Sequence, residues 1–172
     1  MSEGKGRGDT AAAWWRRALA DRDSGAARGL TARLRRATPL ETLVEPAVHE
    51  LARLLGLGAA QAGVLVRMVQ VLAEIRENDP APLARRLGGA DPEMSNLRFQ
   101  RLLRAKGEDA AAAMRRAVIM ADRRCNVARL ARDILAWDHP DRGDRIRAEW
   151  CFDYFGAPPP GADKQPSEET AR

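Results

Sequence analysis

The chain has 172 residues, of which 45% are hydrophobic and 31% are charged, and it carries a formal net charge of +5. These proportions exclude a disordered chain, and the length suffices for one domain or two small lobes without a disulfide or metal staple. Cys125 and Cys151 form no close pair and no metal-binding motif. The N-terminus lacks the apolar stretch of a signal peptide, and no apolar run is long enough to span a membrane. We therefore expect a cytoplasmic protein with no membrane contact, no cofactor and no metal ion.

Alanine, leucine and arginine dominate the composition and β-branched residues are sparse, which predicts an all-α fold. We predict a disordered N-terminus at residues 1–9, followed by helices at about residues 10–20, 25–37, 39–55 and 59–77. Ser24 has the position of an N-cap, Thr38 and Glu41 have the pattern of a capping box, and Gly56 is placed to end the third helix. Pro46 is expected to bend that helix or restart it.

The second half of the chain predicts five further helices, at about residues 83–87, 96–106, 108–122, 127–137 and 144–155. Ser95 and Asn126 are the expected N-caps of two of them. A stretch rich in proline and glycine around residues 88–92 predicts a boundary between an N-terminal lobe, residues 10–88, and a C-terminal lobe, residues 94–156. Residues 157–172 are predicted to form a disordered tail. The fold class is thus a two-lobed helical bundle of about eight helices.

Basic charge is concentrated in two separate blocks of the sequence. Residues 1–36 have a net charge of +5 and residues 98–132 one of +7, whereas residues 37–97 and 133–156 each have −3. Of the 29 basic residues, all but Lys5, Lys106 and Lys164 are arginines. Clustered arginines of this kind are typical of a surface that binds phosphate groups.

Helical phase indicates which arginines face outward. In the helix after Ser95, Phe99 and Leu102 belong to the apolar stripe, so Arg101 and Arg104 project from the opposite side and Arg98 lies at its flank. In the next helix the phase places Arg116 outward and Arg115 at the edge of the apolar face. In the helix after Ser24, Arg33 and Arg36 face outward. Local salt bridges could occupy any single arginine, but the segment 98–104 has no acidic residue at i±3 or i±4 within its helix.

Two other functions remain open at this point. Asp138, Asp141 and Asp144 could hold a divalent metal as in a nuclease, although Pro140 and Gly143 are typical of a turn that starts the last helix. The helices around Asn126 could instead form a helix-turn-helix that reads duplex DNA as a regulator.

The tryptophan pair Trp14–Trp15 is expected to place one ring in the core and to leave the other available as a contact for a partner or a nucleobase.

Several segments, in this order and spacing, resemble one known family. They are AWWRRAL at residues 13–19, LVEPAVHELARLLG at 43–56, LARRLGG at 83–89, MSNLRFQRLLRA at 94–105, NVARLARDILAWD at 126–138 and RIRAEWCFDYFGA at 145–157. The chain resembles the CasB family, the small subunit of the type I-E CRISPR-associated Cascade surveillance complex. The likeness spans about residues 13–157 and contains no catalytic motif.

The resemblance implies a non-enzymatic, two-lobed helical subunit that works in antiviral defence. Its implied partners are the other Cascade subunits (the large subunit and the crRNA-binding backbone subunit), a second copy of itself, crRNA and the displaced single-stranded DNA of the R-loop. It implies nucleic-acid contacts at a set of arginines: Arg35, Arg36, Arg98, Arg101, Arg104, Arg115, Arg116 and Arg142, with Arg16 and Arg17 as secondary candidates. Arg67 is expected to be a further contact or an ion-pair partner of Glu74 or of another helix.

Overall fold

The computed structural model describes residues 6–156, which are almost entirely helical. The helices of the first half are α1 (Gly6–Trp15), α2 (Gly25–Arg36), α3 (Pro39–Leu43), α4 (Pro46–Leu55) and α5 (Ala62–Leu72). Those of the second half are α6 (Leu83–Leu87), α7 (Asn96–Arg104), α8 (Gly107–Met120), α9 (Val127–Ala136) and α10 (Arg142–Tyr154). A π-helix, η1 (Arg16–Ala20), continues α1, and a 3₁₀ turn, η2 (Ala59–Gln61), precedes α5. The predicted all-α fold is confirmed.

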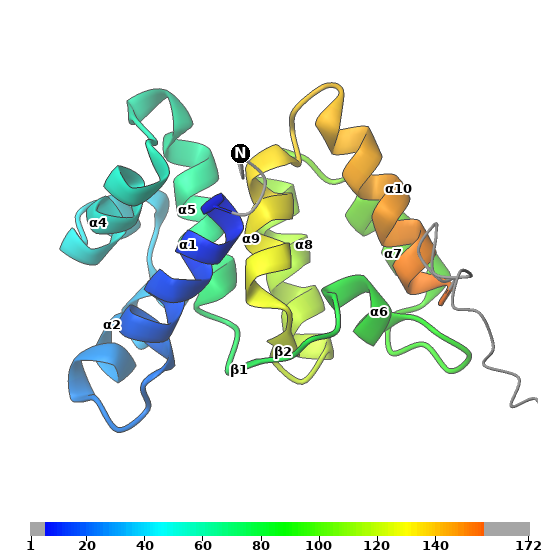
Figure 1. The fold of residues 1–172 in the computed structure, drawn as a ribbon, viewed down its shortest axis with the longest axis horizontal. Helices are drawn as coiled ribbons and strands as arrows, with labels where there is room; N and C mark the ends of the chain where they lie inside the picture. The colour runs from blue at the N-terminus through cyan, green and yellow to red at the C-terminus, as the bar shows by residue number, and fades with distance from the viewer. Residues whose placement is uncertain (1–5, 157–172) are drawn as a thin grey trace, which may run out of the picture.

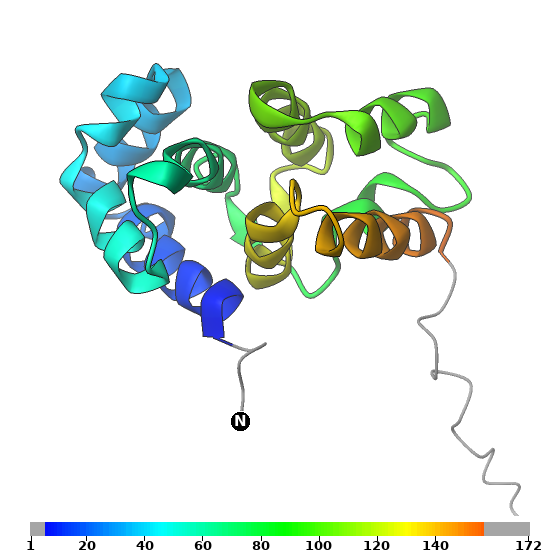
Figure 2. The same cartoon turned by 90° about the horizontal axis from the view of Figure 1, so that it is seen from above.

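The helices form two groups joined through the centre of the molecule. Figure 1 shows α1, α2 and α4 on one side, α6, α7 and α10 on the other, and α5, α8 and α9 between them. The view from above shows the same division (Figure 2). The buried apolar side chains nevertheless form one continuous cluster with members from both groups. The predicted lobe boundary around residues 88–92 stays a prediction.

Local sequence determines where several helices begin and end. The Ser24 hydroxyl accepts a hydrogen bond from the amide of Ala27, and Thr38 and Glu41 form the predicted capping box. Gly56 has a φ of 66°, the left-handed conformation that glycine adopts most easily, and it ends α4. The predicted third helix is divided in two, because Pro46 starts α4 after a break at Val44 and Glu45.

The first helix starts earlier than predicted, so the expected disorder of residues 1–9 is wrong for Gly6–Asp9, which are helical. The reason lies in the packing of α1 against α9. A Cβ atom at Gly8 would come within 2.4 Å of the carbonyl oxygen of Ala128, so the absence of a side chain lets the two helices approach closely. The rest of that predicted segment and the predicted tail at residues 157–172 lie outside the described residues.

One short pair of strands was not predicted. The predicted helix over residues 59–77 ends at Leu72, and β1 (Glu77–Asn78) pairs in parallel with β2 (Arg124–Cys125). The pairing aligns Glu77 with Arg124 and joins the segment after α5 to the segment after α8. Two-residue strands carry no periodic signal, and their pairing depends on contacts distant in sequence.

Within residues 6–156, no single helix has both the length and the apolar character needed to cross a membrane; α4 and the segment Ala59–Leu72 would meet the test only as a pair bent by 106°.

Candidate nucleic-acid interface

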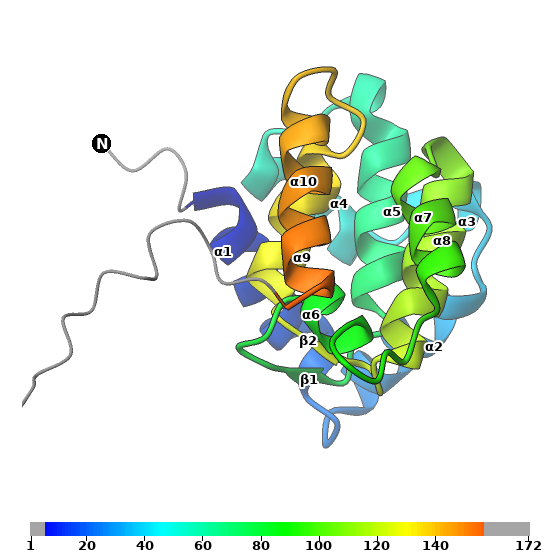
Figure 3. The same cartoon turned by 90° about the vertical axis from the view of Figure 1, so that its right-hand side faces the viewer.

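The groove between α7 and α8 brings together four of the predicted arginines. In α7 the side chains of Phe99 and Leu102 are buried against the core, which turns Arg98, Arg101 and Arg104 toward solvent. A period of 3.6 residues per turn places residues three apart on one side of a helix, so these three arginines share a face. Figure 3 shows α7 and α8 running side by side along one edge of the molecule.

Helix α8 supplies the second wall of this groove. Its buried side, which includes Met114 and Ala117, leaves Arg116 exposed. The groove has a volume of about 730 Å³. It is lined by alanine, leucine and methionine side chains and by five charged ones. The lining residues are Met94, Arg98, Arg101, Leu102, Arg104, Ala105, Asp109, Ala112, Ala113, Arg116 and Met120. Four guanidinium groups thus face one carboxylate.

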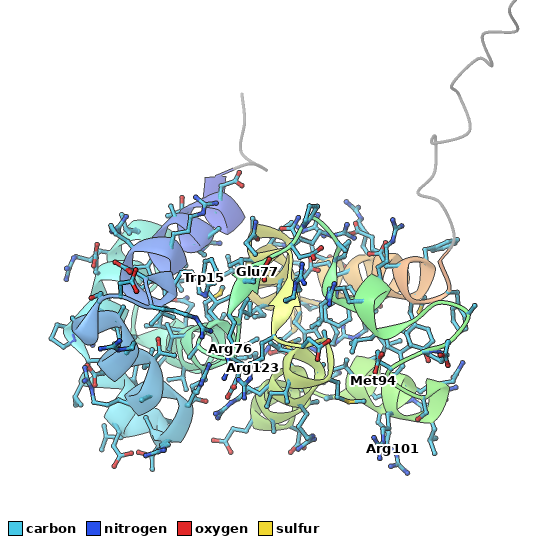
Figure 4. All side chains as sticks on the ribbon, turned by 90° about the horizontal axis from the view of Figure 1, so that it is seen from below. Trp15, Arg76, Glu77, Met94, Arg101 and Arg123 are labelled. Carbon is cyan, nitrogen blue, oxygen red and sulfur yellow. The ribbon has the colours of Figure 1, made fainter. Side chains whose placement is uncertain are left out.

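The arginines of the groove have no partners within residues 6–156. Among the described residues, the guanidinium groups of Arg98, Arg101, Arg104 and Arg116 form no ion pair and no hydrogen bond with the protein. Figure 4 shows the side chain of Arg101 extending away from the molecule on the same side as Met94. Every guanidinium fork in the groove therefore remains available to donate hydrogen bonds to an external anion.

Two other predicted arginines converge on a buried carboxylate. Glu74 is 4% exposed, and Nη2 of Arg115 lies 2.9 Å from its Oε1. Nε of Arg35 donates to the carbonyl oxygen of Ala73 at 2.9 Å and lies 3.6 Å from Oε2 of Glu74. Arg123 also bonds the Glu74 carboxylate. These contacts link α2 and α8 to the end of α5. Arg35 and Arg115 therefore stabilise the packing of these three helices.

The remaining predicted arginines are spread over the surface. Arg16, Arg36 and Arg142 are exposed and, within residues 6–156, form no ion pair. Arg17 is also exposed but its Nη2 lies 2.7 Å from Oε1 of Glu50. None of these four lines the groove between α7 and α8.

Of the three aspartates considered for a metal site, Asp138 is bound to an arginine, and Asp141 and Asp144 face solvent. Arg67 is 4% exposed, and its Nη2 lies 2.6 Å from Oδ2 of Asp138. Arg67 thus pairs with a residue of the turn after α9, and not with Glu74 or with another helix as expected. Asp141 and Asp144 are exposed at the start of α10. Among the described residues, no group of three acidic, histidine or cysteine side chains is arranged to hold a metal ion.

The arginines of α9 are used inside the protein. Arg129 bonds Asp153 at 2.9 Å, and Arg132 bonds Glu149 and Asp133 at 2.6 Å. Burial raises the pKa of Asp133, an effect that Arg132 opposes. Because α10 supplies Glu149 and Asp153, the ion pairs of Arg132 with Glu149 and of Arg129 with Asp153 link α9 to α10. A helix whose arginines are bound in this way offers few groups for reading base edges, which disfavours the helix-turn-helix alternative.

The tryptophan pair is buried as a whole. Trp14 is 0% and Trp15 3% exposed, and Nε1 of Trp14 donates to the carbonyl oxygen of Ala47 at 3.0 Å. The expectation that one ring stays available for a partner or a nucleobase is therefore wrong. Helix α1, which carries both tryptophans, packs against α9 and α4, contacts that the local sequence does not reveal.

Helical phase identified the four arginines of the groove but missed two acidic residues that define the surface. Glu74 accounts for the neutralisation of Arg35 and Arg115, and Asp109 is the carboxylate of the groove. Asp109 lies two residues into α8, so the sequence could have indicated its place beside the groove. Glu74 lies 41 residues before Arg115, so the sequence could not have indicated their ion pair.

The fold and this surface define a class: an all-helical protein with a solvent-facing groove of arginines that form no ion pair within the described part of the chain. The family model for CRISPR-associated protein Cse2 matches residues 11–155, and the chain therefore belongs to this family. Its members, also called CasB, are structural subunits of type I-E Cascade, so the resemblance seen in the sequence is confirmed. No curated protein and no solved structure matches the chain.

Proposed function

We propose that this chain is a non-catalytic Cascade subunit that holds nucleic acid by its phosphate backbone and stabilises the R-loop. The observation that carries the proposal is the groove between α7 and α8, where Arg98, Arg101, Arg104 and Arg116 have no partner among the described residues. Its principal ligand is the displaced DNA strand, and the duplex of crRNA with target DNA is a second one.

The physics of the groove suits this task. Arginine forks donate paired hydrogen bonds to phosphate oxygens and do not distinguish bases, so the same contacts serve any target sequence. Formation of an R-loop exchanges one duplex for another of similar stability, so modest backbone contacts shift the balance toward the open state. The apolar part of the groove that reaches the surface, which includes Ala112, Ala113 and Met120, adds contact area for a strand.

The other candidate arginines are ranked by their surroundings. Arg16, Arg36 and Arg142 are exposed and unpaired within residues 6–156, so each can add a phosphate contact. Arg17 would first have to leave Glu50. Arg35 and Arg115 are bound to Glu74 and its neighbourhood, and we assign them a supporting role.

Contacts with the other Cascade subunits and with a second copy require surface away from the groove. Leu40 and Val44 are 72% and 69% exposed and lie four residues apart, and Phe152 and Phe155 are 54% and 63% exposed near the end of α10. Exposed apolar groups that lie close together are typical of protein interfaces. We propose these two places as subunit contacts.

The test compares two double charge reversals in the assembled complex. Arg101→Glu with Arg104→Glu alters the groove, whereas Arg53→Glu with Arg145→Glu alters two exposed arginines, on α4 and α10, that form no ion pair among residues 6–156. Both variants change the net charge by the same amount. We expect the groove variant to assemble and to open target duplex more weakly than wild type, and the control to open it normally.

The measurement is the fraction of target duplex opened, by permanganate reactivity of the displaced strand, with Mg²⁺ present so that cleavage by the subunit would be seen. Equal opening by the two variants would remove the groove from the mechanism. Scission of the strand by the purified subunit would contradict the non-catalytic assignment.

A further inference from the structure

A second basic pocket lies on a different part of the molecule. It is formed by the end of η1, by α2 and by the turn after α5, and has a volume of about 210 Å³. Its lining residues are Leu19, Ala20, Arg22, Arg28, Thr31, Ala32, Arg35, Ile75 and Arg76. Four of these nine residues are arginines and none is acidic. Figure 4 shows Arg76 with Arg123 on the underside, near the middle of the molecule and well apart from Arg101.

Most of the donors in this pocket are unused. The side chains of Arg22 and Arg76 form no hydrogen bond with the described residues, and both are exposed. Arg28 uses one nitrogen, Nη1, on the carbonyl oxygen of Arg22 at 3.1 Å. Arg35 uses Nε on the carbonyl oxygen of Ala73, so its two terminal nitrogens have no hydrogen-bond partner among residues 6–156.

The pocket concentrates positive charge. The carboxylate of Glu74, which lies 3.6 Å from Nε of Arg35, is shared with Arg115 and Arg123. Burial lowers the pKa of Arg35, the charges of Arg123, Arg76 and Arg22 lower it further, and the charge of Glu74 opposes them. Like charges held this close repel one another, and an anion between them removes that cost.

We propose that this pocket binds a single phosphate group. Several convergent guanidinium forks require a ligand with several acceptor oxygens in a compact volume, and phosphate offers three or more. The group is either inorganic phosphate or one phosphodiester of a strand. Only the second case rests on the proposed function, because a free phosphate would bind whether or not the subunit holds DNA.

The first experiment uses inorganic phosphate and the full chain. Arg22→Ala with Arg76→Ala removes two donors from the pocket, and Arg53→Ala with Arg145→Ala removes two exposed arginines elsewhere. Phosphate is titrated at constant ionic strength, and binding is followed by the Nε–H NMR signals of the arginines and by the thermal midpoint of unfolding. We expect phosphate to shift the signals of Arg28 and Arg35 and to raise the midpoint of wild type and control.

The pocket variant should bind phosphate at least about tenfold more weakly than wild type. The reason is that loss of one charge-assisted hydrogen bond lowers affinity by about tenfold. All four substituted arginines lack side-chain partners among residues 6–156, so both variants should fold. Equal binding by the pocket variant and wild type would overturn the proposal, and so would an equal loss in the control.

A second arm distinguishes the two sources of phosphate. If the pocket holds a strand, inorganic phosphate competes with single-stranded DNA for wild type, and the pocket variant binds the strand more weakly than the control variant. If the pocket binds only inorganic phosphate, the pocket variant and the control variant bind the strand with the same affinity. The phosphate titration still distinguishes these two variants. The groove variant Arg101→Glu with Arg104→Glu should keep its phosphate binding, so failure of the proposed function leaves this test intact.

Discussion

At the scale of single residues, two neighbours in the chain have opposite roles. Arg115 bonds the buried carboxylate of Glu74, whereas Arg116 extends into the groove and has no partner among the described residues. Helical phase predicted the exposure of Arg116 correctly, because phase depends on local sequence alone. It could not predict the ion pair of Arg115, because that depends on how α5 and α8 pack.

Removal of the Glu74 carboxylate should be costly. Glu74→Ala leaves Arg35, Arg115 and Arg123 without their shared partner, and breaking a buried ion pair from one side costs about 3–5 kcal/mol. The free energy of unfolding from urea denaturation measures the loss. Asp109→Ala, which removes an exposed carboxylate, should change stability by about 0.5 kcal/mol or less. Similar values for both variants would contradict the structural role of Glu74.

The ion pair between Arg33 and Glu45 should make stability depend on acidity. The hydrogen bond from Arg33, with Nε 2.6 Å from Oε1, holds the pKa of Glu45 below its usual value. A carboxyl group whose pKa is lowered by folding stabilises the protein above its ordinary pKa, and this stability is lost as the pH falls through the lowered value. Glu45→Gln should therefore be less stable than wild type at pH 7, and the gap should close below about pH 4.

The urea midpoint of unfolding, measured from pH 7 to pH 3, checks this expectation. Glu93→Gln is a suitable control, since Glu93 is exposed and forms no ion pair among residues 6–156. A gap for Glu45→Gln that stays constant over this range would exclude the linkage.

At the scale of helices and strands, the sequence predicted where helices begin and end better than it predicted which elements contact one another. Ser24, Thr38 and Asn126 cap helices as expected, because capping depends on residues two or three positions away. The start of α1 at Gly6 and the pairing of β1 with β2 were missed. Both depend on segments more than 40 residues away, which hydrophobic periodicity does not encode.

Gly88 marks a close approach of the same kind between α6 and α10. A Cβ atom there would come within 1.9 Å of the carbonyl oxygen of Tyr154, and the next amide, that of Gly89, donates to this oxygen at 2.8 Å. Gly88→Ala should thus force the helices apart and destabilise the protein by about 1–3 kcal/mol.

The matched control is Gly63→Ala in α5, where a Cβ atom has no neighbour within 4 Å. That substitution should be neutral or should stabilise the protein by up to about 1 kcal/mol, because alanine favours the helix more than glycine does. Thermal unfolding of the two variants gives the comparison, and a shift of the same sign in both would contradict this account of Gly88.

At the scale of the whole molecule, the acidic segments neutralise part of the arginine surface and leave the groove charged. Glu45, Glu74 and Asp153 each bond arginines from other elements. The alternation of charge along the chain, visible in the sequence, is thus partly cancelled in three dimensions. Which block stays unpaired depends on packing, and the sequence alone therefore gave a longer list of candidate arginines than the structure leaves available.

Binding to single-stranded DNA should depend steeply on salt. If the four arginines of the groove each neutralise one phosphate, the slope of log affinity against log salt is about −3, since each contact to a single strand contributes about −0.7. Arg101→Glu with Arg104→Glu should make the slope shallower by at least about 1.4. Fluorescence anisotropy between 50 and 200 mM salt measures it, with unrelated strands of equal length expected to bind alike. A slope unchanged by the substitutions would place the strand elsewhere.

The arginines of the groove also govern how the molecules behave toward one another. Two identical faces that each carry four guanidinium groups against the single carboxylate of Asp109 repel, so concentrated protein at low ionic strength should remain dispersed. A long polyanion reverses the sign of that interaction, because one strand can lie in the grooves of several molecules at once. Turbidity should then be greatest where the added phosphate charge equals the charge of the protein, and it should decline when the strand is in excess.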